Sequence, residues 1–137
     1  MLRMIHHICI DTDCYKESIN FYVAVMGFTV VHEDMDQVQR TLNSWLKKND
    51  ILIEVQTPKH SEKVMPVKNG SILAGINHVC FLVDNIDLEV SQIKTRGWKN
   101  FNKKEDEIIY LVDGAKVCKV LAPEGTVIEL REQNICF

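Results

Sequence analysis

One short pattern occurs twice in this chain, and it constrains the fold more than any other feature. The order His-x-Cys-x-x-x-Asp runs from His7 to Asp13 and again from His78 to Asp84. The two histidines are 71 residues apart (78 − 7), and so are the two aspartates (84 − 13). A repeat of this length predicts a duplicated structural unit in which both copies fold in the same way.

Other landmarks recur in the same order in both copies. Each copy has a strand pattern, then a helical pattern that ends at a glycine, Gly27 or Gly97, and then an aromatic residue. Asp13 is the expected N-cap of the first helix, and Asp84 or Asp87 that of the second. Further strand patterns follow, including a hairpin around the polar turn "KKND". The sequence therefore predicts strand, helix and about three more strands, twice.

A linker separates the two copies. Residues 57–75 carry two of the three prolines and two of the six glycines, which are the residues that interrupt regular structure. We therefore expect a first module at 1–57, a linker at 58–75 and a second module at 76–137, together forming one structural domain.

Composition excludes several classes of function. The chain has 137 residues and a net charge of −3, with its charges interspersed, so neither nucleic acid nor a membrane surface is an expected partner. No apolar run approaches the length of a membrane span, and the N-terminus lacks an export signal. The five cysteines include no CxxC pair, which favours free thiols in a reducing compartment. We expect a cytoplasmic protein that binds a small molecule.

Two histidines and two glutamates stand at matching places in the copies. His7 and Glu54 belong to the first copy, and His78 and Glu129 to the second, each expected in the middle of an apolar strand. A carboxylate in such a place is costly unless it is paired, hydrogen-bonded or bound to a metal. The four side chains together suit one divalent ion, Ni, Zn, Co, Mn or Fe, with two coordination positions left open.

A different ligand set is also open. Cys9 and Cys80 share a strand face with His7 and His78, so a closed Cys2His2 zinc site is an alternative. That set leaves both glutamates unexplained, and the cysteines are then simpler to interpret as small apolar fillers. His6 alternates to the other side of its strand and is not expected to be a ligand.

At these residues the sequence resembles the vicinal oxygen chelate superfamily, which includes glyoxalase I and methylmalonyl-CoA epimerase. The similar segments are "HHICI", "SINFYVAVMGF", "ILIEVQTP", "GINHVCFLVDNID" and "APEGTVIEL". The resemblance implies an α+β fold of two tandem βαβββ modules, which form an open, barrel-like mixed sheet around a metal cleft. It also places the family's metal ligands at His7, Glu54, His78 and Glu129, and it implies a homodimer.

The resemblance further implies a glyoxalase I-like lyase or isomerase. Such an enzyme removes a proton from a small α-hydroxycarbonyl or thioester-type substrate and stabilises the enediolate with its metal. Glu129 is the first candidate for the base and Glu54 the second. Asp11 stands where glutathione-using members usually have arginine, which disfavours glutathione. An epimerase of the methylmalonyl-CoA type and a binding or resistance protein without catalysis are the alternatives.

Overall fold

The structure is a computed structural model of the chain, and it describes all residues except 2, 36–41, 64, 66–73 and 133–137. The chain divides into two compact units, Met1–Pro66 and Val67–Phe137. Of the predicted linker 58–75, residues 64 and 66–73 lie outside the described residues. In the part of the chain that the structure describes, no helix is both long enough and apolar enough to cross a membrane.

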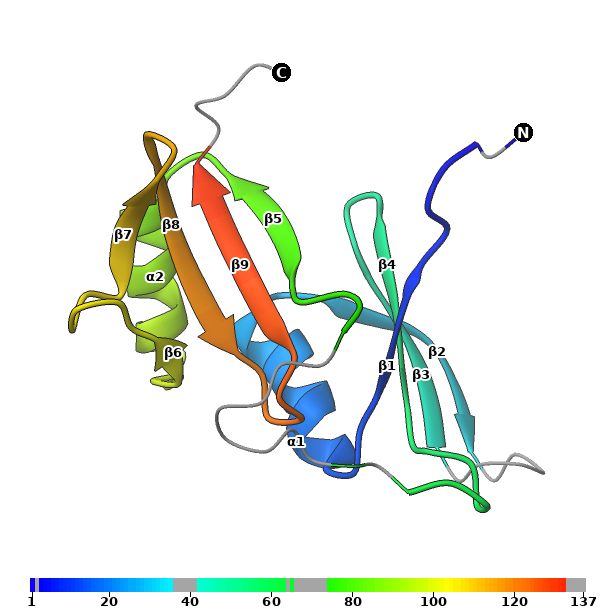
Figure 1. Cartoon of the computed structure of the whole chain (residues 1–137). Coiled ribbons are helices and arrows are strands. Elements are labelled where there is room, and N and C mark those ends of the chain that lie inside the picture. Colours follow the sequence, from blue (N-terminus) through cyan, green and yellow to red (C-terminus); the bar gives the residue numbers. More distant parts are fainter. Residues whose placement is uncertain (2, 36–41, 64, 66–73, 133–137) are drawn as a thin grey trace. The chain divides into compact units, whose positions relative to one another are not determined.

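The first unit is a four-stranded mixed sheet with one helical segment (Figure 1). Its elements are β1 (Ile8–Asp11), α1 (Tyr15–Asn20), the π-helical turn η1 (Phe21–Val25), β2 (Thr29–Met35), β3 (Leu42–Lys48) and β4 (Ile51–Gln56). The strand order is β1-β4-β3-β2, and β1 runs parallel to β4 while the other pairs are antiparallel. The predicted order of strand, helix and three strands is confirmed for this unit.

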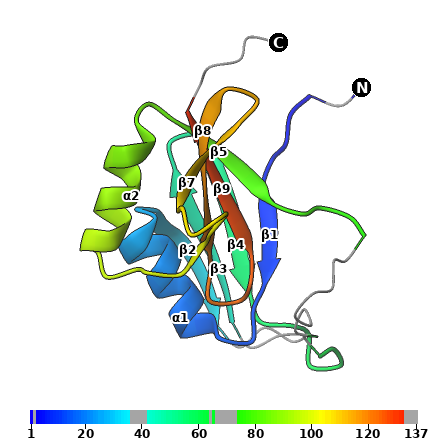
Figure 2. The same ribbon diagram turned by 60° about the vertical axis from the view of Figure 1, so that its left-hand side comes forward.

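The second unit repeats this arrangement around its own sheet. Its elements are β5 (Val79–Val83), α2 (Ile86–Thr95), β6 (Phe101–Asn102), β7 (Ile109–Val112), β8 (Ala115–Leu121) and β9 (Val127–Glu132). The order is β5-β9-β8-β6, with β7 also paired to β8, and β5 runs parallel to β9. In each unit the helix packs against its own sheet, α1 on β4 and α2 on β8 and β9 (Figure 2).

The second unit has one more strand than predicted. Both β6 and β7 pair with β8, the first at Lys119 and Val120 and the second along 115–118, so together they take the place that β2 has in the first unit. The segment between them turns sharply, with positive φ at Glu105 (51°) and Asp106 (66°). A continuous extended strand cannot pass through such residues, and the equivalent of β2 is therefore split.

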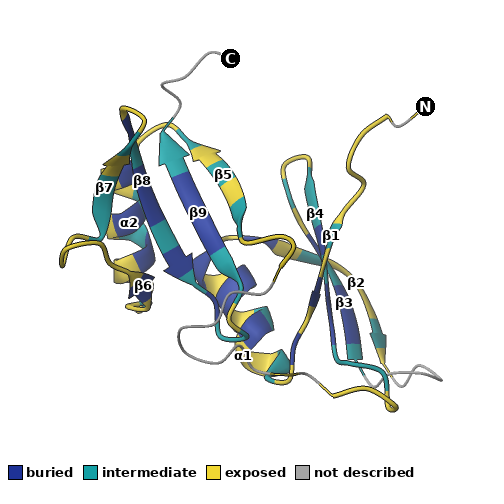
Figure 3. Cartoon of the chain, viewed as in Figure 1, coloured by how far each residue is buried: buried dark blue, intermediate teal, exposed yellow. Residues whose placement is uncertain are grey.

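The α+β fold class is confirmed. The described strands form two separate mixed sheets, and neither sheet closes into a barrel. Apolar side chains between helix and sheet form the core of each unit, visible as the dark strands and helix faces in Figure 3. Large, fully buried residues include Phe21, Tyr22, Leu46 and Ile53 in the first unit, and Ile86, Ile93, Val120 and Ile128 in the second.

Both helical segments end where the sequence predicts, but they begin differently. Gly27 and Gly97 have φ of 78° and 88°, the left-handed conformation that ends a helix at low cost only in glycine. The N-cap of α2 is Asn85, whose side-chain oxygen accepts a hydrogen bond from Leu88 N at 2.9 Å. The N-cap of α1 is Cys14, which makes no capping bond, so neither aspartate prediction was correct.

Candidate metal centre

In the first unit, the chain brings His7 and Glu54 together by pairing two parallel strands. Cys9 in β1 lies opposite Glu54 in β4, so the histidine two residues earlier shares the face of the sheet on which the carboxylate lies. His7 Nε2 is 3.6 Å from Glu54 Oε2. The histidine precedes β1, which begins at Ile8, and was expected in the middle of a strand.

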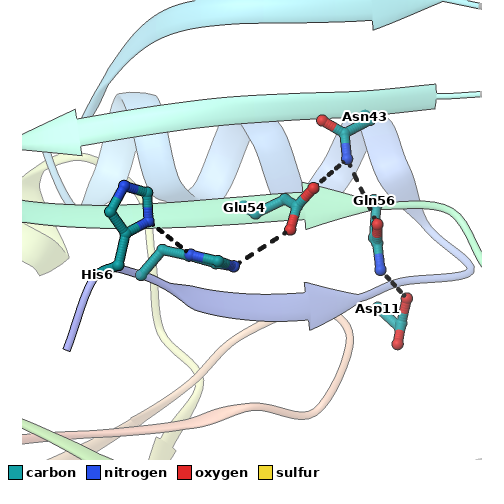
Figure 4. Close-up of polar contacts among 6 residues, drawn as sticks. His6, Asp11, Asn43, Glu54 and Gln56 are labelled. Atoms are coloured by element: carbon teal, nitrogen blue, oxygen red, sulfur yellow. Dashed lines mark hydrogen bonds and ion pairs between the residues drawn. The ribbon is translucent and has the colours of Figure 1, made fainter. Parts of the chain in front are cut away.

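Glu54 is held by a row of polar side chains, shown in Figure 4. Asn43 Nδ2 donates to Glu54 Oε1 at 2.5 Å and lies 3.4 Å from Gln56 Oε1. Gln56 Nε2 in turn donates to Asp11 Oδ1 at 2.9 Å. These bonds occupy Oε1 of Glu54 and leave Oε2 directed at the imidazole.

Aromatic contacts hold the imidazole of His7 on the same face. Trp45 lies opposite Glu54 on β3, and its ring centroid is 4.9 Å from that of His7 at an interplanar angle of 67°. His6 also contacts His7, because their Nδ1 atoms are 2.9 Å apart. The expectation that His6 points away from its neighbour is therefore wrong, since strict alternation holds only within a strand and both residues precede β1.

The second unit builds the same pair with different neighbours. Cys80 in β5 lies opposite Glu129 in β9, and His78 Nε2 is 3.6 Å from Glu129 Oε2. His78 also precedes its strand, which begins at Val79, and was not expected there. The residue opposite Glu129 on β8 is Lys119, whose Nζ is 3.7 Å from Oε2, the same oxygen that faces the imidazole.

The negative charge of Glu129 helps to raise the pKa of two neighbouring groups, the Cys80 thiol and the Tyr110 hydroxyl. Desolvation of the sulfur, the negative charge of Glu129 and a hydrogen bond to it raise the pKa of the Cys80 thiol to about 11. Burial, followed by the charge of Glu129, also raises the pKa of the Tyr110 hydroxyl. Glu129 itself is 9% exposed, so its field acts in surroundings with little water to screen it.

The hydrogen bonding of His78 fits a cation between the imidazole and the carboxylate. His78 Nδ1 is 3.0 Å from Asn77 Oδ1, an oxygen that can only accept, so Nδ1 carries the hydrogen. In the tautomer that carries its one hydrogen on Nδ1, the ring presents the lone pair of Nε2 towards a carboxylate oxygen 3.6 Å away. Two acceptors that face each other are favourable when a cation lies between them. Metal-binding histidines are commonly oriented by such a partner on the other nitrogen.

Each unit supplies two of the four predicted ligands. Among the described residues, no three His, Cys, Asp or Glu side chains are gathered closely enough to hold a metal ion. The four-residue site of His7, Glu54, His78 and Glu129 therefore stays a prediction, and so does the alternative Cys2His2 set. Cys9 and Cys80 are exposed as whole residues, although the sulfur of Cys80 is partly desolvated, so neither cysteine is a fully buried filler.

Sequence reasoning missed three residues that surround these pairs. Asn43, Trp45 and Lys119 lie on the strands next to the glutamates and contact either a glutamate or its histidine. A signal for two of them was available, because the register of each closing hairpin places Trp45 opposite Glu54 and Lys119 opposite Glu129. Hairpin register can be counted outward from the turn residues.

Residues 6–132 match the Glyoxalase/Bleomycin resistance protein/Dioxygenase superfamily, and the chain belongs to this family. It is 27% identical over 135 residues to the uncharacterized protein YwkD of Bacillus subtilis (strain 168), covering 97% of this chain and 99% of that protein.

Two similar solved structures span nearly the whole chain. The glyoxalase family protein from Enterococcus faecalis has a TM-score of 0.80 at 23% identity, with 95% of this chain and 98% of that chain covered. The protein SMU.1112c has a TM-score of 0.80 at 22% identity, with 96% and 100% covered. At these identities the likeness shows the fold.

More distant members of the fold have different activities. They include the fosfomycin resistance protein FosX from Listeria monocytogenes, a glyoxalase I mutant from Zea mays and the antibiotic-binding protein TnmS3 from Streptomyces sp. CB03234. Their identities to this chain lie between 10% and 14%, and their TM-scores between 0.67 and 0.71. This chain covers 97% of the FosX chain, 44% of the glyoxalase I chain and 98% of the TnmS3 chain. The superfamily therefore holds both enzymes and binding proteins.

Proposed function

We propose that this protein is a metal-dependent, glyoxalase I-like lyase or isomerase that acts on a small α-hydroxycarbonyl or thioester-type substrate. His7, Glu54, His78 and Glu129 would together hold one divalent ion, Ni, Zn, Co, Mn or Fe. The observation that carries the proposal is the repeated pair of imidazole Nε2 and carboxylate Oε2, 3.6 Å apart in both units. A single pair has simpler explanations, but the same pair at duplicated positions is typical of a shared ligand set.

The bound ion would polarise the carbonyl of the substrate and stabilise the negative charge of the enediolate. The chain itself supplies the base. A carboxylate of the protein would take a proton from the carbon beside the carbonyl and would return it to the other carbon of the enediolate. The side chain that acts as the base must therefore be free to move between these two carbons.

The contacts of the two glutamates favour Glu129 as this base. Glu54 is fixed by the 2.5 Å hydrogen bond from Asn43. Glu129 receives no such short bond from an amide: Lys119 Nζ is 3.7 Å from its Oε2, longer than a charge-assisted hydrogen bond, and its other hydrogen-bond partner is the weak donor Cys80. Glu129 is thus the carboxylate that can turn towards a substrate at lower cost, and Glu54 is the one suited to stay a ligand.

A binding protein without catalysis is the second candidate, and the ion pair between Lys119 and Glu129 favours it. The ammonium group already balances part of the carboxylate's charge, so a metal ion is not needed for that purpose. TnmS3, a member of the same fold, is an antibiotic-binding protein. Stoichiometric binding of a small molecule that a chelator leaves unchanged, without turnover, would support this candidate.

Metal analysis and isotope exchange test the leading proposal. Freshly purified wild-type protein should contain one divalent ion per chain. In D2O it should exchange a carbon-bound proton of either a methylglyoxal hemithioacetal or methylmalonyl-CoA, and the probe that exchanges separates a glyoxalase from an epimerase. Glu129→Gln should keep some metal but lose exchange by about 100-fold or more, and Glu54→Gln should mainly lose metal. Metal-free protein that gains no thermal stability from Ni, Co, Zn or Mn would contradict the proposal.

A further inference from the structure

The two sheets differ in charge on the face that carries the glutamate, which we call the ligand face. On the first ligand face, the residue opposite Glu54 is Trp45, and the residue two places after Glu54 is Gln56, bonded to Asp11. Each of these residues is neutral or acidic. The first ligand face therefore carries no positive charge beside its glutamate at these positions, apart from what the histidine can supply.

At the duplicated positions, the second ligand face is basic. Lys119 stands opposite Glu129, and Arg131 stands two residues after it on β9. Leu82 is paired with Arg131 in the place that Asp11 has in the first unit. Arg131 already donates from Nη2 to the carbonyl oxygen of Val112 at 3.1 Å, whereas Lys119 reaches towards Glu129. At these two duplicated positions, opposite the glutamate and two residues after it, only the second ligand face is positively charged. The first ligand face has a lysine one pair farther along, Lys47 opposite Leu52.

The predicted site has more positive than negative charge when Lys119 is added to the two glutamates and the divalent ion. Glu54 and Glu129 supply two negative charges, which one divalent ion would neutralise. The ammonium of Lys119, the cation that lies next to Glu129 Oε2, then has no counter-charge among the four predicted ligands, and its side chain is only 23% exposed to water. With a cation on Oε2, Glu129 can no longer serve as a full counter-charge for this ammonium. A partly buried, unpaired ammonium is costly, and an anion next to it would be bound favourably.

We propose that Lys119 binds an anionic group on the substrate, and that this group is a carboxylate. The inference rests on the proposed function, since it assumes a metal ion beside Glu129. One ammonium beside Glu129 matches one carboxylate. Arg131, two residues after Glu129 on β9, keeps its own charge but donates to the carbonyl oxygen of Val112 and not to the glutamate. The site then takes a small molecule with two metal-chelating oxygens at one end and a carboxylate within reach of Lys119.

Three chelating probes test this assignment on the cobalt-loaded protein. Acetohydroxamate presents two adjacent oxygens and no further charge, malonic acid monohydroxamate adds a carboxylate, and phosphonoacetohydroxamate adds a phosphonate. Dissociation constants are measured by the change in cobalt absorption. The carboxylate probe should bind wild type about tenfold more tightly than acetohydroxamate, the factor expected for one charge-assisted hydrogen bond. Lys119→Met should remove this preference, and Lys119→Arg should keep part of it.

Lys116→Met is the matched control. Lys116 lies on the same strand, but it pairs with Asp87 of α2 and not with a glutamate of the predicted site, so this variant should keep the preference. Cobalt affinity is the second readout. Loss of a positive charge beside Glu129 should leave cobalt affinity unchanged or raise it, whereas a drop would mean that Lys119 shapes the ligands and would overturn the assignment.

The outcomes separate this inference from the proposed function. Wild type that binds no cobalt would overturn both. Cobalt binding with equal affinity for all three probes, or a preference that survives in Lys119→Met, would overturn this inference alone. A larger preference for the phosphonate probe that Lys119→Met abolishes would replace the carboxylate by a phosphonate.

Discussion

The side-chain amide of Asn43 donates to Glu54 Oε1 at 2.5 Å, while its own oxygen, Oδ1, is buried and has no hydrogen-bond partner among the described residues. A buried polar group that is only half satisfied lowers stability. Asn43 therefore stands where an apolar residue would cost the fold little, and its contact with Glu54 gives a functional reason for an asparagine there.

The first prediction replaces Asn43 by the residue at the duplicated position, Val117, which lies on β8 where Asn43 lies on β3. Asn43→Val should lower metal affinity by about 10- to 100-fold, because Glu54 loses the bond that orients it. Urea unfolding of the metal-free protein should change by no more than about 1 kcal/mol, since the unpaired oxygen is removed as well. Unchanged metal affinity would show that Glu54 does not need Asn43.

The second prediction concerns stabilisation by metal. Adding Co²⁺ or Ni²⁺ to chelator-treated protein, at 100 times its dissociation constant, should raise the free energy of unfolding by about 2.7 kcal/mol, because the ion binds only the folded state. His78→Gln should lose this gain. His32→Gln is the control: His32 pairs with Asp34 at 3.1 Å, but both side chains are largely exposed. If His32→Gln abolished the gain too, the stabilising ion would lie elsewhere.

The third prediction follows from the raised pKa of the Cys80 thiol. In metal-free protein this group should stay protonated until the pH approaches about 11, so its alkylation by iodoacetamide should be slow at pH 8 and rise steeply above pH 9. Mass spectrometry of the Cys80 peptide measures the rate. Glu129→Gln removes the negative charge that opposes the thiolate and should accelerate alkylation at pH 8. Protein unfolded in urea is the reference, and equal rates in both states would contradict the shift.

The fourth prediction concerns the end of α2. Gly97 has φ of 88°, and a Cβ there would meet nothing within 4 Å, so Gly97→Ala should cost only backbone strain, about 1–2 kcal/mol. Gly97→Asn should cost less, because asparagine tolerates the left-handed conformation better. Chemical denaturation of both variants gives the comparison, and equal losses would mean that the backbone conformation is not the cause.

Local signals explain what could be predicted from the sequence. The order of elements, the helix ends at Gly27 and Gly97, and the hairpin around Asn49 all depend on residues near one another in the chain. The His–Glu pairs were found because the duplication doubles a weak signal. Each glutamate alone would be an ordinary strand residue, but Glu54 and Glu129 recur at matching places, and each lies 3.6 Å from the histidine of its own copy.

Non-local pairing explains what the sequence did not reveal. The positions at which β1 and β5 begin are set by their partners β4 and β9, so His7 and His78 could not be placed outside the strands from periodicity alone. The split into β6 and β7 depends on backbone turns at Glu105 and Asp106 that residue type does not announce. The role of Asn43 depends on a diagonal contact, because it lies opposite Gln56 and bonds Glu54, and hairpin register alone does not give that contact.

Placement of both histidines just ahead of their strands gives the protein a particular freedom to evolve. The sheets are fastened by the ladders that start at Ile8 and Val79, so the backbone of His7 and His78 is not bound into them. Substitutions of His6 or Asn77 can change the orientation of the neighbouring imidazole and leave the hydrogen bonds between the strands in place. Selection for another ion or another substrate can therefore act on residues 6–7 and 77–78 without removing a strand pairing.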